Sequence, residues 1–289
     1  MSLDIGKALR DGVDRTTARN GLVLAAVFVA FRLVNAVVNQ SLGRVWAGEF
    51  LDDLAANPPS LEGTELTRAE FQQALADIRE AVRGSTQLAY LDSLSVAELI
   101  GIAVVLAVVA EAIRIVAVRV FVSPETESLP AALMTRNLLP AVVNGIVGRI
   151  VAAILIGVGL VFLVVPGVFL FIAFLFLRQE IAVEDENFIR ALSESWTLTS
   201  GHRLELFALV VALVVISLVA SLVAGFLGSS VVATVVNTAV GALVLTYSVA
   251  VVSRAYDQLR TADATPAEEG AGPDDDSEEF ADIDDELLP

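Results

Sequence analysis

The sequence predicts an all-α polytopic membrane protein with six transmembrane helices, arranged as three hairpin repeats with short interfacial helices. Hydrophobic residues make up 56% of the 289-residue chain, above the roughly 45–50% that soluble domains show. Forty consecutive residues, 138–177, carry a single charge, Arg149. A bilayer core about 30 Å thick needs about 20 apolar residues per helix, so this stretch is long enough for two spans. The pair Pro166-Gly167 inside it predicts the turn between them.

Six apolar stretches reach the length of a membrane-spanning helix. They are residues 21–38, 97–118, 144–165, 166–183, 206–226 and 231–253. We expect residues 1–260 to form one six-helix transmembrane domain, with residues 39–96 as an extracytoplasmic helical loop insertion.

The net charge of −17 is concentrated at the C-terminal end. Residues 261–289 contain twelve acids and no base, whereas the first 260 residues carry 23 acids against 18 bases. Low hydropathy with like charge predicts a disordered acidic tail over 261–289. The chain has no dense basic patch, which argues against a nucleic-acid partner. Lys7 is the only lysine beside seventeen arginines, a composition that resembles the acidic proteomes of halophilic archaea. The absence of cysteine excludes disulfides and thiolate metal sites.

The distribution of bases predicts the orientation in the membrane. Twelve bases fall on the side that holds both termini, and four fall in the long loop 39–96 on the other side. The first set is Lys7, Arg10, Arg15, Arg19, Arg114, Arg119, Arg136, Arg178, Arg190, Arg203, Arg254 and Arg260, and the second is Arg44, Arg68, Arg79 and Arg83. Because positive residues are enriched on the cytoplasmic side, we expect a multi-pass protein of the cell membrane with both termini in the cytoplasm.

Three short segments that precede the first, third and fifth spans resemble one another. They are residues 5–9, 129–133 and 188–192. An Asn-Gly pair follows the first two segments at the same distance, at Asn20 and Asn144, and Arg203 holds that position in the third. We therefore expect an interfacial helix followed by a helical hairpin three times over, with an insertion in the first unit.

The third interfacial segment shows the clearest pattern. Phe188, Leu192 and Trp196 recur every four residues as one apolar stripe, with a tryptophan suited to the headgroup level. Asp185 is expected to cap the helix and Gly201 to follow its end. A helix that only faces the protein core would show the same stripe, and both interpretations stay open.

The long loop predicts two amphipathic helices. Residues 67–70 read as a capping box, and Leu66 and Phe71 hold the positions of a hydrophobic staple. Upstream, four apolar residues recur every four positions from Leu42 to Leu54. We expect both helices to lie over the outer mouth of the bundle, either as a lid over a path or as a cover that stabilises the fold.

Three stretches together resemble a known pattern: VVPGVFL at 164–170, IAVED at 181–185 and ALSESWTLTSG at 191–201. The order of a Pro-Gly pair, an acidic residue and an AL-x-x-S-W-x-L-T-x-G segment resembles a superfamily of six-span proteins. This superfamily includes the membrane domain attached to some bacterial glycerophosphodiester phosphodiesterases and related uncharacterised membrane proteins. In those enzymes a separate soluble barrel carries the catalysis, so the resemblance implies fold and location, and no catalytic residue transfers to this chain.

Catalysis requires a nucleophile with a base, paired carboxylates, or metal ligands at short spacing. The single histidine, His202, follows the third interfacial segment, where a cation complements the helix dipole. The acidic clusters 52–53 and 274–276 lie in predicted solvent-exposed segments without basic or aromatic neighbours. We therefore expect a non-enzymatic protein with no catalytic residue, no cofactor and no metal site.

Charges inside the spans are the most informative polar residues, because each costs about 2.5–3.5 kcal/mol at the helix centre on insertion scales. Glu111 in the second span and Arg149 in the third lie at similar depths, and we expect them to form an ion pair. That pair could fix the packing of the hairpins or act as a proton or ion relay. Arg32 and Asn35 lie in the outer half of the first span, where Arg32 could extend outward or reach Glu98.

Small residues on the fifth and sixth spans predict that these helices pack closely. The rows are Ser217, Ser221 and Gly225 on the fifth span, and Ala233, Asn237 and Gly241 on the sixth. Asn237 also adds a polar group inside the membrane.

These features favour a scaffold or accessory membrane protein that contacts the lipid bilayer and other membrane proteins. The alternative is a small-solute transporter or channel with a path between the hairpins. Arg32, Asn35 and Asn237 are the intramembrane polar residues that such a path would use. The oligomeric state stays open.

Overall fold

A computed structural model describes residues 3–60, 67–228 and 230–264. Over these ranges the chain is helical and contains no strand. The helices are α1 (Ile5–Thr17), α2 (Arg19–Ala56), α3 (Arg68–Ser85), α4 (Val96–Val122), α5 (Ala131–Thr135), α6 (Leu138–Phe162), α7 (Val164–Ala173), α8 (Leu177–Val183), α9 (Phe188–Thr199), α10 (Arg203–Gly225) and α11 (Val231–Ala264). With α7 and α8 counted as one span, six described helices are long and apolar enough to cross a membrane, which confirms the predicted all-α multi-pass class. The rest of the predicted acidic tail, 265–289, lies outside the described residues.

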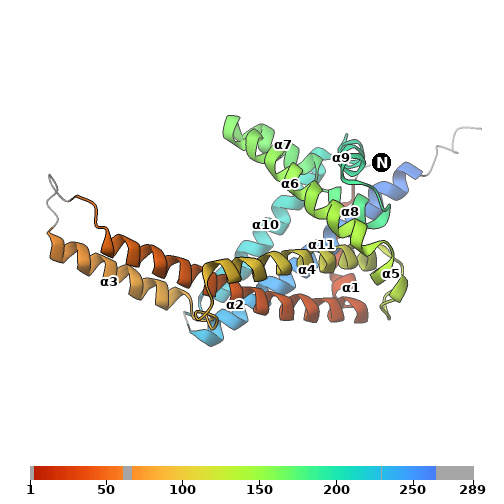
Figure 1. Ribbon diagram of the computed structural model, residues 1–289. Coiled ribbons are helices and arrows are strands. Elements are labelled where there is room, and N and C mark those ends of the chain that lie inside the picture. The colour runs from red at the N-terminus through yellow and green to blue at the C-terminus, as the bar shows by residue number, and fades with distance from the viewer. Residues whose placement is uncertain (1–2, 61–66, 229, 265–289) are drawn as a thin grey trace, which may run out of the picture.

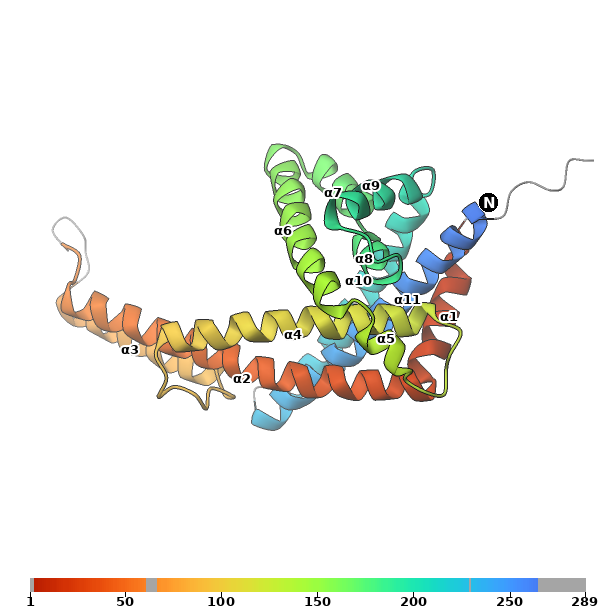
Figure 2. The same cartoon turned by 45° about the vertical axis from the view of Figure 1, so that its right-hand side comes forward.

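Helices α4 and α11 form the centre of the bundle (Figure 1). α11 contacts α1, α2, α4 and α10, and α4 contacts α2, α6 and α8 as well. The hairpin of α6 and α7 projects from this centre to one side, with α9 beside it (Figure 2). This arrangement brings side chains of α4, α6 and α8 to one place, which is where the candidate site lies.

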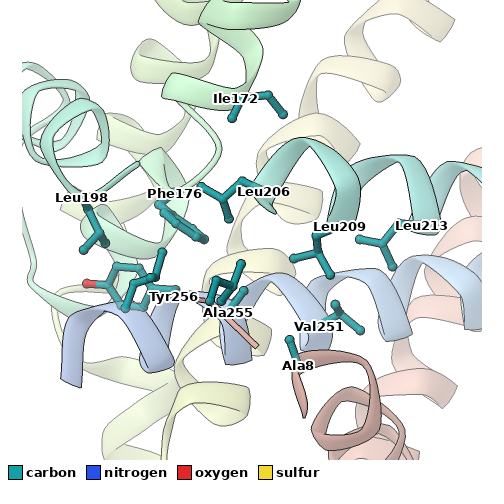
Figure 3. Close-up of a cluster of buried hydrophobic side chains, with 12 residues drawn as sticks. Ala8, Ile172, Phe176, Leu198, Leu206, Leu209, Leu213, Val251, Ala255 and Tyr256 are labelled. Carbon is teal, nitrogen blue, oxygen red and sulfur yellow. The ribbon is translucent and has the colours of Figure 1, made fainter. Parts of the chain in front are cut away.

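A buried apolar cluster joins the first and last helices to the fourth span. Ala8, Phe176, Leu206, Val251 and Tyr256 pack together there, each at most 1% exposed (Figure 3). The rings of Phe176 and Tyr256 meet edge to face, with their centroids 5.6 Å apart. By contrast, the outer faces of α6 and α10 expose many large apolar side chains. Such surface would be a liability in water and suits contact with lipid.

The turn between the third and fourth spans lies at Leu163, which has extended backbone between α6 and α7. The predicted turn at Pro166-Gly167 is therefore wrong by three residues. Pro166 falls in the first turn of α7, where its missing N–H leaves no hydrogen bond unmade. Gly167 serves close packing, because a Cβ there would lie 2.4 Å from Leu160 Cγ.

The fourth span is broken between Ala173, the last residue of α7, and Leu177, the first of α8. Ser195 of α9 bridges this break, since its Oγ donates to Ala173 O at 2.9 Å and accepts from Phe176 N at 3.2 Å. Thr199 Oγ1 lies 3.4 Å from the same Ala173 oxygen. Backbone groups freed inside a membrane need partners within the protein, and these two hydroxyls provide them.

The insertion after the first span forms a two-helix arm. α2 continues without interruption to Ala56, and α3 folds back along it. Arg44 holds the returning chain, donating from Nε to Thr86 Oγ1 at 2.9 Å and from Nη1 to Ala89 O at 3.2 Å. Thr67 and Glu70 form the predicted capping box, whereas Leu66 of the predicted staple lies outside the described residues.

This arm projects away from the bundle (Figures 1 and 2), so the expectation that its helices lie over the outer mouth is wrong. The apolar residues from Leu42 to Leu54 belong to the end of α2 rather than to a separate helix. Trp46 and Phe50 stack with ring centroids 5.8 Å apart and remain 59% and 54% exposed. Because no proline or capping residue stops α2 at the end of the span, the helix runs on past it.

Short helices α1, α5 and α9 precede α2, α6 and α10, and α5 has only five residues. The N-cap of α9 is Asn187, whose side chain accepts from Ile189 N and Arg190 N, so the expected cap at Asp185 is wrong. After α9, Gly201 has a φ of +86°. Phe188 and Leu192 pack against a buried cluster, and Trp196, 40% exposed, contacts the rings of α7 and its linker.

Candidate functional site

Glu111 of α4 is surrounded by three arginines, and its side chain is only 1% exposed. Arg178 of α8 lies nearest, with its Nε 2.9 Å from Glu111 Oε1. Arg149 of α6 places Nη1 3.3 Å from Oε2, and Arg114, one turn along α4, places Nη1 3.7 Å from the same oxygen. Side chains from three helices thus converge on one carboxylate.

Gly145 makes this approach possible, because it lies directly against the carboxylate. A Cβ there would stand 2.9 Å from Glu111 Oε1. The preceding Asn144 ties α6 to the start of α9, since its Oδ1 accepts from Phe188 N at 3.1 Å. The Asn-Gly pair at this position therefore fixes both α9 and the space for Glu111.

The cluster of Glu111, Arg114, Arg149 and Arg178 carries a net charge of +2 when all four groups are ionised. All three guanidinium groups have unused donors. Arg178 donates to Glu111 from Nε and Nη2 only. Within the described part of the chain, Arg149 and Arg114 form ion pairs with Glu111 and no side-chain hydrogen bond. The Arg149 side chain is 42% exposed. An arginine presents five N–H donors, so this cluster has more donors than the Glu111 carboxylate can accept.

A cavity of about 340 Å³ opens beside the cluster. We call it the arginine cavity. Its polar end is formed by Glu111, Gly145, Arg149, Arg178 and Gln179. Its apolar walls are Val118, Ala152, Ala153, Ile156, Phe171, Phe174, Leu175, Leu177, Ile181, Val249 and Val252, with Ser248 as the one hydroxyl.

The polar and apolar residues of the arginine cavity lie at different levels along the helices. Arg119 lies eight residues beyond Glu111 on α4 and meets Asp185 at 3.0 Å, about 12 Å along the axis. Val118 and Ile181 line the cavity between its polar groups and this charged layer. Along α6 its wall continues from Gly145 to Ile156, about 16 Å further from it. The polar groups therefore lie between Val118 and Ile181 on one side and the longer apolar wall of α6 and α7 on the side away from the charged layer.

The charged layer itself is a network around Asp185, which has a φ of +55°. Arg119 donates to Ala182 O at 2.6 Å and to Asp185 Oδ1 at 3.0 Å. Arg136 reaches Asp185 Oδ2 at 3.1 Å. Asp185 is the acidic residue of the IAVED stretch, and its contacts hold α4, the start of α6 and the start of α9 together.

Arg32 has a different partner from the one expected. Its Nη1 donates to Gly241 O of α11 at 2.8 Å, so the expected contact with Glu98 is wrong. Glu98 instead closes a capping box with Ser95 at the start of α4. Gly241 admits the guanidinium, because a Cβ there would stand 3.2 Å from Arg32 Nη1.

A second cavity, of about 420 Å³, lies between α10 and α11 and is reached by Arg32. We call it the Arg32 cavity. The small residues Ser217, Ser221, Asn237 and Gly241 face each other across it. Helices α10 and α11 are in contact, as predicted, but Ser217, Ser221, Asn237 and Gly241 line an open space between them instead of packing together. A third cavity, of about 290 Å³, is lined by Arg32, Asn35 and Arg114 among others.

Two further ionisable groups were not expected to matter. Glu180 of α8 is fully buried, and within the described residues its carboxylate has no hydrogen bond, the nearest cation being Arg260 at 4.0 Å. His202 pairs through Nδ1 with Glu205 Oε2 at 2.9 Å. Among the described residues no group of three His, Cys, Asp or Glu could hold a metal.

The sequence analysis identified Glu111 and Arg149 but missed Arg114 and Arg178, both of which it assigned to the membrane surface. The turn seen in the structure explains the position of Arg178. Arg149 precedes the turn residue Leu163 by fourteen positions, and Arg178 follows it by fifteen. Equal distances from a hairpin turn place two residues at the same level on antiparallel helices.

Residues 3–259 match a family model described as "Domain of unknown function (DUF7847)". The chain belongs to the DUF7847 family. The match spans every described helix up to most of α11, so the arginine cavity, the broken span and the arm all fall within the DUF7847 domain. No curated protein and no solved structure matches the chain.

Proposed function

We propose that this protein is a non-enzymatic accessory protein of the cell membrane that binds an anionic group in the arginine cavity. One observation carries the proposal: three arginines surround the single carboxylate of Glu111 beside an open cavity. A buried ion pair that served packing alone would need one arginine. The excess positive charge, inside a helix bundle where each charge is costly, calls for a counter-anion.

The non-enzymatic part of the proposal rests on the chemistry of the lining. The polar groups of the arginine cavity are guanidinium, carboxylate, amide and hydroxyl groups, and the carboxylate is occupied by arginines. Arginine does not lose its proton in proteins and binds anions without reacting with them. The cavity is therefore suited to recognition, which fits a protein that contacts lipid or a membrane partner.

The orientation and the internal repeat form part of the same proposal. The excess of arginine on the side of both termini supports a cytoplasmic location for that side. Asn20 and Asn144 make comparable contacts, since Asn20 Nδ2 donates to Glu125 O, shortly before α5, and Asn144 accepts from Phe188 N at the start of α9. These parallel contacts support three related hairpins. The likeness to the membrane domain of glycerophosphodiester phosphodiesterases lies in residues 164–201, from α7 to α9, and supports a common fold.

Binding can be measured by tryptophan fluorescence. The chain has two tryptophans, and a Trp46→Phe variant leaves Trp196, whose ring lies 6.2 Å from that of Phe174 in the cavity wall. Inorganic phosphate should change its emission saturably in detergent-solubilised protein. Arg149→Gln should weaken that response at least about tenfold. Arg190→Gln, an exposed arginine of α9 paired with Glu186, is the matched control and should leave it unchanged. The proposal would be contradicted if the Trp46→Phe protein gave no response, or if it and its Arg149→Gln and Arg190→Gln variants all responded equally.

A transporter is the second candidate, and a specific observation favours it. Ser248 lines both the arginine cavity and the Arg32 cavity, and Arg32 in turn lines the third cavity with Arg114. Polar side chains thus follow one another through the bundle, beside a broken fourth span, a feature that transporters use at their binding sites. Vesicles containing the purified protein should then release entrapped phosphate, and Arg32→Gln should slow the release. Binding without release would assign the accessory role.

A further inference from the structure

The shape of the arginine cavity says more about its ligand than its charge does. Val118 and Ile181 separate the polar groups from the Arg119–Asp185 layer, and the longer apolar wall of α6 and α7 runs from Arg149 and Arg178 away from that layer. A free inorganic anion would use only the polar end. A lipid of the adjacent leaflet has the same arrangement as the cavity, with its headgroup at the surface and its chains pointing inward.

The charge selects among headgroups. The cluster of three arginines and one glutamate has an excess of two positive charges. A phosphate monoester carries about −1.5 to −2 at neutral pH and three acceptor oxygens, whereas a phosphodiester carries a single negative charge. Only the monoester neutralises the cluster, and a guanidinium such as that of Arg149 binds it with two parallel hydrogen bonds.

The walls fit a hydrocarbon chain. Ala152, Ala153 and Ile156 on α6 face Phe171 and Phe174 on the other arm of the hairpin, and Val252 of α11 closes the side. Ligand pockets of about 300–1,000 Å³ lined in this way bind small molecules. The arginine cavity, of about 340 Å³, has room for a headgroup and the first part of one chain. The exposed apolar face of α6 beyond it continues toward the bilayer centre and can contact the remainder.

We infer that the arginine cavity binds a membrane lipid whose headgroup is a phosphate monoester, with its phosphate on Arg149 and Arg178 and one chain along α6 and α7. This inference rests on the proposed function and names the ligand class for the same site. It commits to the lipid as the source of the phosphate, and the experiment separates that source from free phosphate.

The test uses the full-length Trp46→Phe protein in detergent, titrated with three probes. Dihexanoyl phosphatidic acid, a monoester lipid, should bind at least about tenfold more tightly than dihexanoyl phosphatidylglycerol, a diester, and than inorganic phosphate. Arg149→Gln should abolish the preference for the monoester, and Arg149→Lys should keep part of it.

A second variant probes the chain-binding wall and leaves all four charges in place. Ala153→Phe fills the apolar part of the cavity and should weaken the lipid at least about tenfold while inorganic phosphate binds as before. Ala107→Phe, at an exposed position of α4 outside the cavities described, is the matched control. Equal affinity for monoester and diester, or unchanged lipid binding in Ala153→Phe, would overturn this inference and leave the anion site standing. If the Trp46→Phe protein binds neither phosphate nor lipid, both the proposed anion site and the lipid inference are wrong.

Discussion

Glu111 Oε1 accepts a hydrogen bond from Arg178 Nε at 2.9 Å, a shorter contact than the 3.3 Å that separates Arg149 from the same carboxylate. The arginine closest to the buried acid is thus the one that follows the break in the fourth span. This contact ties α8 to α4, beside the apolar packing of Ile115 and Val118 against Leu177 and Ile181.

A double-mutant cycle should therefore find stronger coupling between Glu111 and Arg178 than between Glu111 and Arg149. Glu111→Gln should cost about 3–5 kcal/mol, because it leaves three arginines without a carboxylate. Arg149→Gln should cost about 1 kcal/mol or less, because the side chain is 42% exposed. Thermal or denaturant unfolding in detergent measures both. The pair Glu111→Leu with Arg149→Leu should not recover stability, since Arg178 and Arg114 remain; full recovery would show that these two do not depend on Glu111.

Ser195→Ala should destabilise the protein by about 1–3 kcal/mol, because Phe176 N and the Ala173 oxygen then lose a buried partner. Unfolding in detergent gives the loss, and hydrogen exchange of the residue 174–176 amides shows its location. Ser193→Ala, two positions earlier on the exposed face of α9, is the control and should change little. Equal stability of the two variants would mean that the break does not need the hydroxyl.

Membrane orientation can be read with single cysteines, since the natural chain has none. A cysteine at Ser60 in the arm should react with an impermeant maleimide in intact cells. A cysteine at Ser193 on α9 should react only after the cells are opened. Both positions are exposed, so accessibility within the protein does not decide the result. The reverse pattern would contradict the assignment of the arginine-rich side to the cytoplasm.

The capping box of α3 should make the arm sensitive to acid. The Thr67 backbone N–H and hydroxyl bond the Glu70 carboxylate and hold its pKa below its ordinary value of 4.5. A carboxyl whose pKa is lowered by folding stabilises the folded state at pH values above its ordinary pKa. This stabilisation is lost as the pH falls through the pKa that the group has in the folded protein. Exchange protection of the first α3 amides, corrected for intrinsic rates, should fall as the pH drops from above 4.5 through the lowered pKa of Glu70. Glu70→Gln should remove that dependence; an unchanged profile in the variant would exclude the carboxylate as its cause.

The six spans could be predicted because each needs only length and apolarity, and the depth of Glu111 and Arg149 followed from those spans. Arg178 could not be placed in the same way. With the turn assumed at Pro166-Gly167, Arg149 and Arg178 lie at unequal distances from it, and the two arginines fall at different depths. With the turn at Leu163, Arg149 and Arg178 lie at nearly the same depth. A leucine with extended backbone cannot be recognised in a sequence, whereas a Pro-Gly pair is a strong turn signal.

Contacts between side chains and distant backbone were also beyond the sequence. Arg32 could be recognised as costly in a span, but its acceptor, Gly241 O, is a backbone atom and has no signature in the side-chain pattern. The arm was misplaced for a related reason: the amphipathic pattern of Leu42 to Leu54 shows a helix, but not that it continues from the span before it.

The position of α11 has a consequence for biogenesis. Gly12 of α1 lies so close to α11 that a Cβ would stand 2.3 Å from Val251 Cγ2, and the Tyr247 hydroxyl donates to Leu9 O at 3.2 Å. α11 also contacts α2, α4 and α10, yet it is the last described helix to be synthesised. Helices α2 and α4 can pack on each other before α11 is made. The contacts of α11 with α1, α2 and α4 can form only after all other described helices have been synthesised, so they complete the described bundle.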